Sequence, residues 1–150
     1  MKLVIQRVKE ARVTVDSKTV GQIGPGILVF VGVAKEDSVA DVEYLVSKLV
    51  ELRIFEDDQG KMNRSALDLG AQFLVVSQFT LLGDCSQGRR PSFDRAAQPG
   101  HAEELYHEFV NQLRAYPIKV ETGQFRAMMD VALINDGPVT FILESSRNAH

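Results

Sequence analysis

Cysteine is almost absent from this chain of 150 residues, which contains only Cys85. A single cysteine excludes an intrachain disulfide and any metal site built from several thiolates of one chain. It is also a poor candidate nucleophile, because the sequence places no obvious base beside it. The low cysteine content favours a reducing cytoplasm.

Long apolar runs are also missing. The N-terminal segment 1–8 has only a few apolar residues before Gln6 and Arg7, too few for a signal peptide or a bilayer-spanning helix. The chain has no repeat, linker or low-complexity stretch, and 150 residues with 45% hydrophobic composition are enough for one core. We therefore expect a soluble, cytoplasmic protein with no membrane partner and a single domain spanning residues 1–150.

The sequence has no excess of positive charge, since 17 basic and 20 acidic residues give a net charge of −3. Most nucleic-acid-binding proteins are basic, so this balance argues weakly against an RNA substrate. An enzyme that acts on the end of a large RNA, however, needs only a local basic patch. The loop over residues 83–98 is a candidate, because it contains Arg89, Arg90 and Arg95.

The common catalytic and metal-binding patterns are absent. His101 and His107 are six residues apart, whereas two metal ligands on one helix face need a spacing of four, and His150 is the last residue. We expect all three histidines to be solvated. The glycines at 21–26 lack the Lys-Ser/Thr of a phosphate-binding loop, and residues 56–60 lack the ligand pattern of a calcium loop. No metal or cofactor is indicated.

Hydrophobic periodicity predicts strands and two helices. Val42, Leu45, Val46 and Leu49 share one helix face after a capping box formed by Ser38 and Asp41. A second amphipathic helix runs from Ala102 to Leu113 and is stopped by Pro117. Strands are expected at 2–8, 11–15, 26–34, 73–82, 118–122, 126–135 and 138–144. This order favours an α/β (mixed α+β) domain with layered mixed sheets and two main helices on one side, a ββα sandwich.

Polar residues interrupt two of these strands. Ser77, Gln78 and Thr80 stand in an otherwise apolar strand, where burial costs free energy unless the groups are hydrogen-bonded or used. In Gly137-Pro138-Val139-Thr140, the proline cannot donate to a sheet and must lie at a strand start, an edge or a bend. Local backbone bonding in the first segment and an ordinary hairpin turn in the second explain the patterns equally well.

The two segments resemble the signature motifs of the D-aminoacyl-tRNA deacylase family. These are Ser77-Gln78-Phe79-Thr80 and Asn135-Asp136-Gly137-Pro138-Val139-Thr140. Segments 6–8, 53–63 and 120–125 are similar to that family as well, so the resemblance spans the chain. It implies hydrolysis of the ester of D-aminoacyl-tRNA, and also of mischarged glycyl-tRNA, as proofreading in translation. The enzyme would be a homodimer whose strands are completed into a barrel-like assembly.

The resemblance also implies roles for residues. Backbone N–H groups of Phe79 and Thr80 would stabilise the oxyanion, with Ser77 and Gln78 as polar supports and help from the 2′-hydroxyl of the substrate ribose. Gly137, Pro138, Val139 and Thr140 would enter the partner's pocket, where a cis Gly-Pro wall excludes L-residues, and Arg7 would brace that motif.

Three alternatives stay open at this point. Thr80 as a covalent nucleophile ranks second to the oxyanion role, because no base is evident nearby. A dimeric module that binds RNA ends or amino acids without turnover is a different class of function. A general esterase would cleave small activated esters of either chirality.

Overall fold

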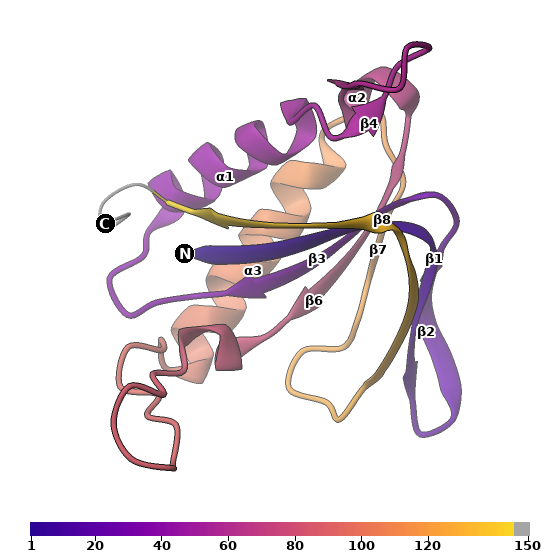
Figure 1. Cartoon of the computed structure of the whole chain (residues 1–150). Coiled ribbons are helices and arrows are strands. Elements are labelled where there is room, and N and C mark those ends of the chain that lie inside the picture. The colour runs from indigo at the N-terminus through magenta and orange to yellow at the C-terminus, as the bar shows by residue number, and fades with distance from the viewer. Residues whose placement is uncertain (146–150) are drawn as a thin grey trace.

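The computed structural model describes residues 1–145, and His150 lies outside them. Its main feature is a six-stranded sheet with the order β2-β1-β3-β6-β7, in which β8 pairs with the other edge of β1 (Figure 1). The strands are β1 (Lys2–Val15), β2 (Lys18–Ile23), β3 (Gly26–Gly32), β6 (Gln72–Ser77), β7 (Val120–Thr122) and β8 (Asp130–Glu144). The first three and β8 pair antiparallel, whereas β6 is parallel to both of its neighbours.

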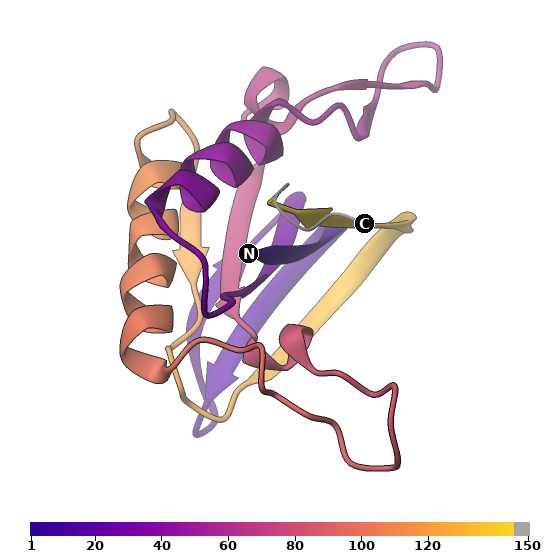
Figure 2. The ribbon, with the colours of Figure 1, turned by 90° about the vertical axis from the view of Figure 1, so that its left-hand side faces the viewer.

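Two helices cover one face of this sheet. They are α1 (Val39–Glu51) and α3 (Pro99–Arg114), and Figure 2 shows both on the same side. Their apolar faces and the inward side chains of β1, β3 and β6, such as Ile27, Phe73 and Val75, form the larger core. The mixed α/β arrangement with two main helices on one side is confirmed.

The opposite face of the sheet curls around a second, smaller core. Leu28, Leu74 and Val76 point into this core, so both faces of β3 and β6 are covered. The curl brings β2 against β7, and a Cβ added to Gly21 would lie 2.4 Å from the carbonyl oxygen of Thr122. Glycine is therefore required where the sheet nearly closes on itself, as in a partial barrel.

The β1 strand is longer than predicted. Segments 2–8 and 11–15 are one continuous strand, because the exposed Lys9 and Glu10 stay within it while its pairing with β8 shifts register. The prediction of a break there was wrong. The actual turn is at Asp16 and Ser17, both with positive φ, and it leads into β2, a strand that was not predicted.

The β8 strand also replaces two predicted strands. Residues 126–135 and 138–144 were expected as separate strands joined by a turn, yet β8 runs through the Gly-Pro step. Asn135 lies opposite Val8 and Thr140 lies opposite Gln6, so both halves pair with β1 in the same direction. The chain does not reverse because β1 offers a continuous partner edge.

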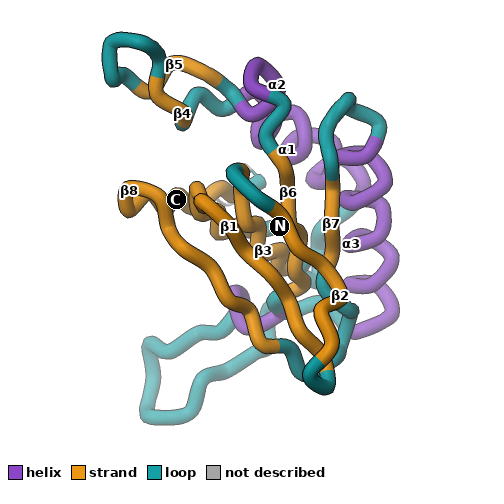
Figure 3. Tube along the Cα trace, turned by 90° about the vertical axis from the view of Figure 1, so that its right-hand side faces the viewer, coloured by secondary structure: helices purple, strands orange, loops and turns teal. Residues whose placement is uncertain are grey.

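The remaining elements form the crossover between β3 and β6. A two-stranded ribbon, β4 (Phe55–Glu56) and β5 (Met62–Arg64), stands clear of the sheet and precedes the short helix α2 (Ala66–Leu69) (Figure 3). Residues 56–60, which lack the calcium-loop pattern, form a mostly exposed turn between these two strands. Hydrogen bonds from Lys61 and Gln59 hold the pKa of Asp57 below its ordinary value, at an exposed turn.

Candidate functional site

An open pocket of about 640 Å³ lies where β3 and β6 end. Its walls come from the turn after β6, the start of α3 and the segment 125–129 after β7. Its lining is mainly apolar and includes Val31, Val76, Phe79, Phe93, Phe125 and Met129. A pocket of this size and character suits a small organic group held by a few polar contacts.

The first motif forms the polar end of this pocket. The strand ends at Ser77, where sequence periodicity had predicted continuation to residue 82. Gln78 donates its N–H to the carbonyl of Val31 on β3 at 2.8 Å, and the chain then turns into a 3-10 helix, η1 (Phe79–Leu82). The prediction of a strand over 78–82 was therefore wrong, although Ser77 and Gln78 line the pocket.

Two backbone N–H groups of η1 are available to a ligand. The first hydrogen bond within the turn runs from the N–H of Leu81 to the carbonyl of Gln78 at 3.2 Å. The N–H groups of Phe79 and Thr80 precede it and have no acceptor inside the turn. The side-chain amide of Gln78 donates to the hydroxyl of Thr80, which ties these two polar side chains together.

Gly32 allows the turn to lie against the end of β3. A Cβ at this position would be 2.6 Å from Cδ2 of Leu82, 2.9 Å from Cβ of Leu81 and 3.2 Å from the carbonyl oxygen of Gln78. Any side chain there would push η1 away from the sheet. Sequence reasoning missed this role, and its only signal was a glycine at the end of an apolar strand.

Two aromatic contacts fix the walls of the pocket. The rings of Phe79 and Phe93 meet edge to face with centroids 5.1 Å apart, which joins η1 to the loop that follows it. Buried Tyr106 packs against Phe125, with centroids 5.7 Å apart, and donates its hydroxyl to the carbonyl of Val75 at 3.0 Å. Burial raises the pKa of Tyr106 to about 12. Sequence analysis had not assigned a role to Phe93, Tyr106 or Phe125.

The second motif is a bend in β8 that is held by hydrogen bonds between its own residues. Asn135 accepts from the N–H of Val139 at 2.7 Å, and its amide donates to the carbonyl of Val139 and to the hydroxyl of Thr140. Between them the Gly137–Pro138 peptide is cis, as the family resemblance implied. Val139 is buried, whereas Gly137 and Pro138 are exposed to solvent.

Arg7, on β1, is hydrogen-bonded to this bend. Although it is a charged residue, only 6% of it is exposed. Its Nε donates to the carbonyl of Asp136 at 3.0 Å, and Nη1 donates to the carbonyl of Ile54 at 2.7 Å. Carboxylates of Asp136 and Glu56 lie 3.7 and 3.8 Å from the guanidinium. The predicted contact between Arg7 and the second motif is therefore present.

The two motifs do not meet within one chain. The first begins at the end of β6, and the second lies in β8, with β3 and β1 between these strands. Ser77 pairs with Val31 on β3, whereas Thr140 pairs with Gln6 on β1. The pocket of one chain is thus separated from the Gly-Pro bend of the same chain by two strands.

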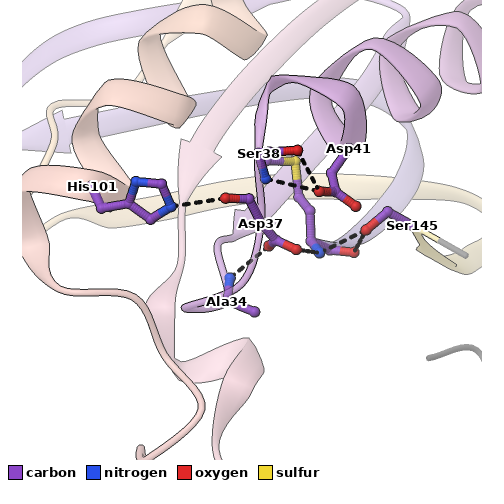
Figure 4. Close-up of polar contacts among 7 residues, drawn as sticks. Ala34, Asp37, Ser38, Asp41, His101 and Ser145 are labelled. Carbon is purple, nitrogen blue, oxygen red and sulfur yellow. Dashed lines mark hydrogen bonds and ion pairs between the residues drawn. The ribbon is translucent and has the colours of Figure 1, made fainter. Parts of the chain in front are cut away.

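His101, His107 and Cys85 lie outside the pocket, and one expectation about them is corrected. His101 was expected to be solvated, but its Nε2 is 2.9 Å from the carbonyl oxygen of Asp37, because α3 begins beside the segment before α1 (Figure 4). There the amino group of Met1 lies 2.6 Å from Oδ1 of Asp37 and 2.8 Å from Oγ of Ser145. His107 and Cys85 are exposed.

Residues 1–145 contain neither a cluster of metal-ligating side chains nor a helix suited to span a membrane. In that part of the chain, no group of three or more His, Cys, Asp or Glu side chains is placed to hold a metal ion. None of its helices is long and apolar enough to cross a membrane.

The fold is shared with solved structures. A protein described as c-Myc DNA Unwinding Element Binding Protein superimposes with a TM-score of 0.92 and 43% identity, over 97% of this chain and 99% of that chain. A probable eukaryotic D-amino acid tRNA deacylase superimposes with a TM-score of 0.83 over 95% of this chain and 98% of that chain. Its identity is 17%, so it bears on the fold alone. These likenesses define a class of small mixed α/β proteins that share this fold.

Sequence comparison specifies the family within that class. The D-Tyr-tRNA(Tyr) deacylase family model matches residues 4–144, and the chain belongs to this family. A D-aminoacyl-tRNA deacylase of Desulfatibacillum aliphaticivorans is 61% identical over 97% of this chain and 99% of its own length. One from Thermosipho africanus is 55% identical over 98% of this chain and 99% of its own length. The resemblance inferred from the two motifs is confirmed.

Proposed function

We propose that this chain hydrolyses the ester bond of D-aminoacyl-tRNA, releasing the D-amino acid and the tRNA, and so proofreads chirality in translation. Full-length relatives of this name, at 55% and 61% identity, support the assignment. The observation that carries the chemistry is a pair of N–H groups without an acceptor in their turn, one at Phe79, which lines the pocket, and one at the next residue, Thr80. The whole chain acts as one deacylase domain, in the cytoplasm, where tRNA is charged.

The substrate needs little from the protein because an aminoacyl ester is already activated. Water adds to the carbonyl carbon, the bond from that carbon to the ribose oxygen breaks, and the ribose oxygen takes the proton. Negative charge develops on the carbonyl oxygen as water adds. N–H donors aimed at that oxygen stabilise the transition state, and losing one such donor typically costs about 10²–10³ in kcat. Ser77 and Gln78 keep the turn in place, and the ribose 2′-hydroxyl assists.

Chirality is controlled by a wall supplied from a second copy of the chain. D- and L-residues carry the same groups, so discrimination comes from what the wrong enantiomer would strike. The bend at Gly137 and Pro138 is exposed and lies two strands away from its own pocket, which supports a role in the pocket of a partner. Exposed apolar residues near it on β8, Phe141 and Ile142, favour burial in a homodimer. Val139 and Thr140 anchor the bend, and Arg7 braces it.

A wall of this kind does not exclude a glycyl ester. Glycine has no side chain to strike Gly137 or Pro138, so we infer some hydrolysis of glycyl-tRNA. The side chain of a D-residue points away from the wall toward solvent, which permits many D-residues as substrates.

The test is release of amino acid from D-tyrosyl-, L-tyrosyl- and glycyl-tRNA by catalytic amounts of the protein, each compared with its spontaneous rate. Rapid loss of the D-ester, slower loss of the glycyl ester and an unchanged L-ester are expected. Cleavage of small esters of either chirality would identify a general esterase instead. Binding of tRNA without acceleration of any ester would identify a binding module.

A further inference from the structure

The loop over residues 84–95 extends from the mouth of the pocket. It leaves η1 at Gly83 and returns at Phe93, whose ring contacts Phe79. A pair of backbone hydrogen bonds between Asp84 and Ser92, of 2.7 and 2.9 Å, closes its base. Figure 2 shows the loop projecting beyond the body of the domain. Its base is therefore fixed to the pocket wall while its tip reaches outward.

Positive charge is concentrated at the tip of this loop. Arg89 and Arg90 follow Gly88, whose φ of +68° makes the tip turn. Both arginines are exposed, and within residues 1–145 neither side chain donates a hydrogen bond or forms an ion pair. By contrast, Arg64 is paired with Asp58 and Arg7 is buried among carbonyls. Two unpaired guanidinium groups are thus displayed beside the pocket of a chain whose net charge is −3.

We propose that Arg89 and Arg90 bind phosphates of the tRNA strand just before its esterified terminal nucleotide. The proposal rests on the proposed function, because the pocket at the base of the loop then holds the ester. Guanidinium groups suit phosphate, which they contact through two parallel N–H donors. The loop supplies the local basic patch that the overall charge lacks.

The reach of the loop specifies which phosphates are involved. Arg90 and Arg89 are three and four residues from Phe93, so at about 3.4 Å per extended residue they lie at most ~10–14 Å from the pocket wall. Nucleotides in a strand advance about 3.4 Å each. The two arginines therefore reach phosphates within about four nucleotides of the ester, and a substrate reduced to its terminal nucleoside lacks those contacts.

The experiment compares two substrates and three proteins. D-tyrosyl-tRNA and D-tyrosyl-adenosine, which has no phosphate, are assayed with the unmodified chain, with R89A/R90A and with K48A/K119A. The control removes two exposed lysines, Lys48 in the last turn of α1 and Lys119 directly before β7, so its change in net charge is the same. The kcat/KM is measured from about 50 to 200 mM salt, and the Kd of uncharged tRNA is measured over the same range.

For each protein, kcat/KM for the tRNA ester is divided by kcat/KM for the adenosine ester. We expect R89A/R90A to lower this quotient about tenfold at low salt. The slope of log Kd for tRNA against log salt should shrink by about 1.4–1.8, since each phosphate contact contributes ~0.7–0.9. K48A/K119A should change neither quantity. An unchanged salt slope for R89A/R90A, or an equal change in K48A/K119A, would overturn the proposal. The deacylase function would survive that result and fails only if the unmodified chain leaves D-tyrosyl-tRNA intact.

Discussion

Arg7 and Asp136 are 129 residues apart in sequence, yet the Nε of Arg7 donates to the backbone carbonyl of Asp136 at 3.0 Å. The same guanidinium donates to the carbonyl of Ile54, so one side chain links the start of the sheet, the crossover segment and the Gly-Pro bend. The position of the second motif thus depends on a residue from the first strand.

Replacing Arg7 should therefore harm both stability and activity. R7A leaves one buried carbonyl group and one partly buried carbonyl group without the donor that Arg7 supplies. Hydrogen bonds from charged groups contribute about 1.5–3 kcal/mol each. We expect R7A to lower the free energy of unfolding by about 2–4 kcal/mol in urea titrations. R7K keeps the charge but cannot reach both carbonyls with a planar group, so it should lie between R7A and the unmodified chain. Equal stability of all three would contradict the bracing role.

Gly32 should be intolerant of a methyl group. The Cβ of G32A lies 2.6 Å from Leu82 and 2.9 Å from Leu81, so η1 must shift. A displacement of about 1 Å at a catalytic group costs roughly 10² in rate. We expect such a loss of kcat on D-tyrosyl-tRNA. G100A is the matched control, because nothing lies within 4 Å of its added Cβ, and its kcat should stay unchanged.

The proposed oxyanion role of the Phe79 N–H can be separated from the role of its ring. F79A and F79P both remove the ring, but only proline removes the N–H, and proline is tolerated at the first position of a helix. F79P should have a kcat about 10²–10³ lower than F79A. T80A keeps its backbone N–H and should lose less than about tenfold. A loss above ~10³ in T80A would instead support Thr80 as a covalent nucleophile.

Tyr106 should make the protein sensitive to alkali. Its pKa is about 12 in the fold against 10.0 for an ordinary tyrosine, so the folded chain keeps its proton more tightly. This stabilisation is complete below pH 10 and is lost as the pH rises from 10 to 12, by an amount of about 2–3 kcal/mol. Y106F removes the ionisable group. The difference in urea midpoint between the two proteins should therefore shrink between pH 9 and pH 12, and a constant difference would refute the account.

A site shared between subunits predicts complementation. F79P removes a donor from the pocket, and G137A strains the bend, because φ at Gly137 is +146° and the added Cβ lies 2.6 Å from Val139. Each homodimer should be nearly inactive. In randomly mixed dimers about 25% of sites should combine an intact pocket with an intact bend, since a twofold dimer repeats the same contact twice. Activity near that level after co-expression is expected, and none would indicate a site within one chain.

Sequence reasoning succeeded where local pattern decides structure. The helix face at Val42, Leu45 and Leu49 and the polar interruption at Ser77 and Gln78 were both visible in the sequence, since periodicity reflects burial. The layers of the fold followed from the order of such segments.

It failed where pairing between distant strands decides structure. The polar residues Lys9 and Glu10 suggested a break, but β1 continues because β8 pairs along it with a shift of register. The end of β6 at Ser77 depends on how the next turn packs on Gly32, and Phe93 reaches the pocket through a loop. None of these contacts produces a periodic pattern in the sequence.

The strand that carries the first motif is shared by both cores. Phe73 and Val75 of β6 belong to the larger core, whereas Leu74 and Val76 belong to the smaller one. Separating β6 from its neighbours would expose side chains on both of its faces, so the free energy of such local opening approaches that of global unfolding. The strand before the site therefore fluctuates little on its own, and on warming it keeps its position until the whole domain melts cooperatively.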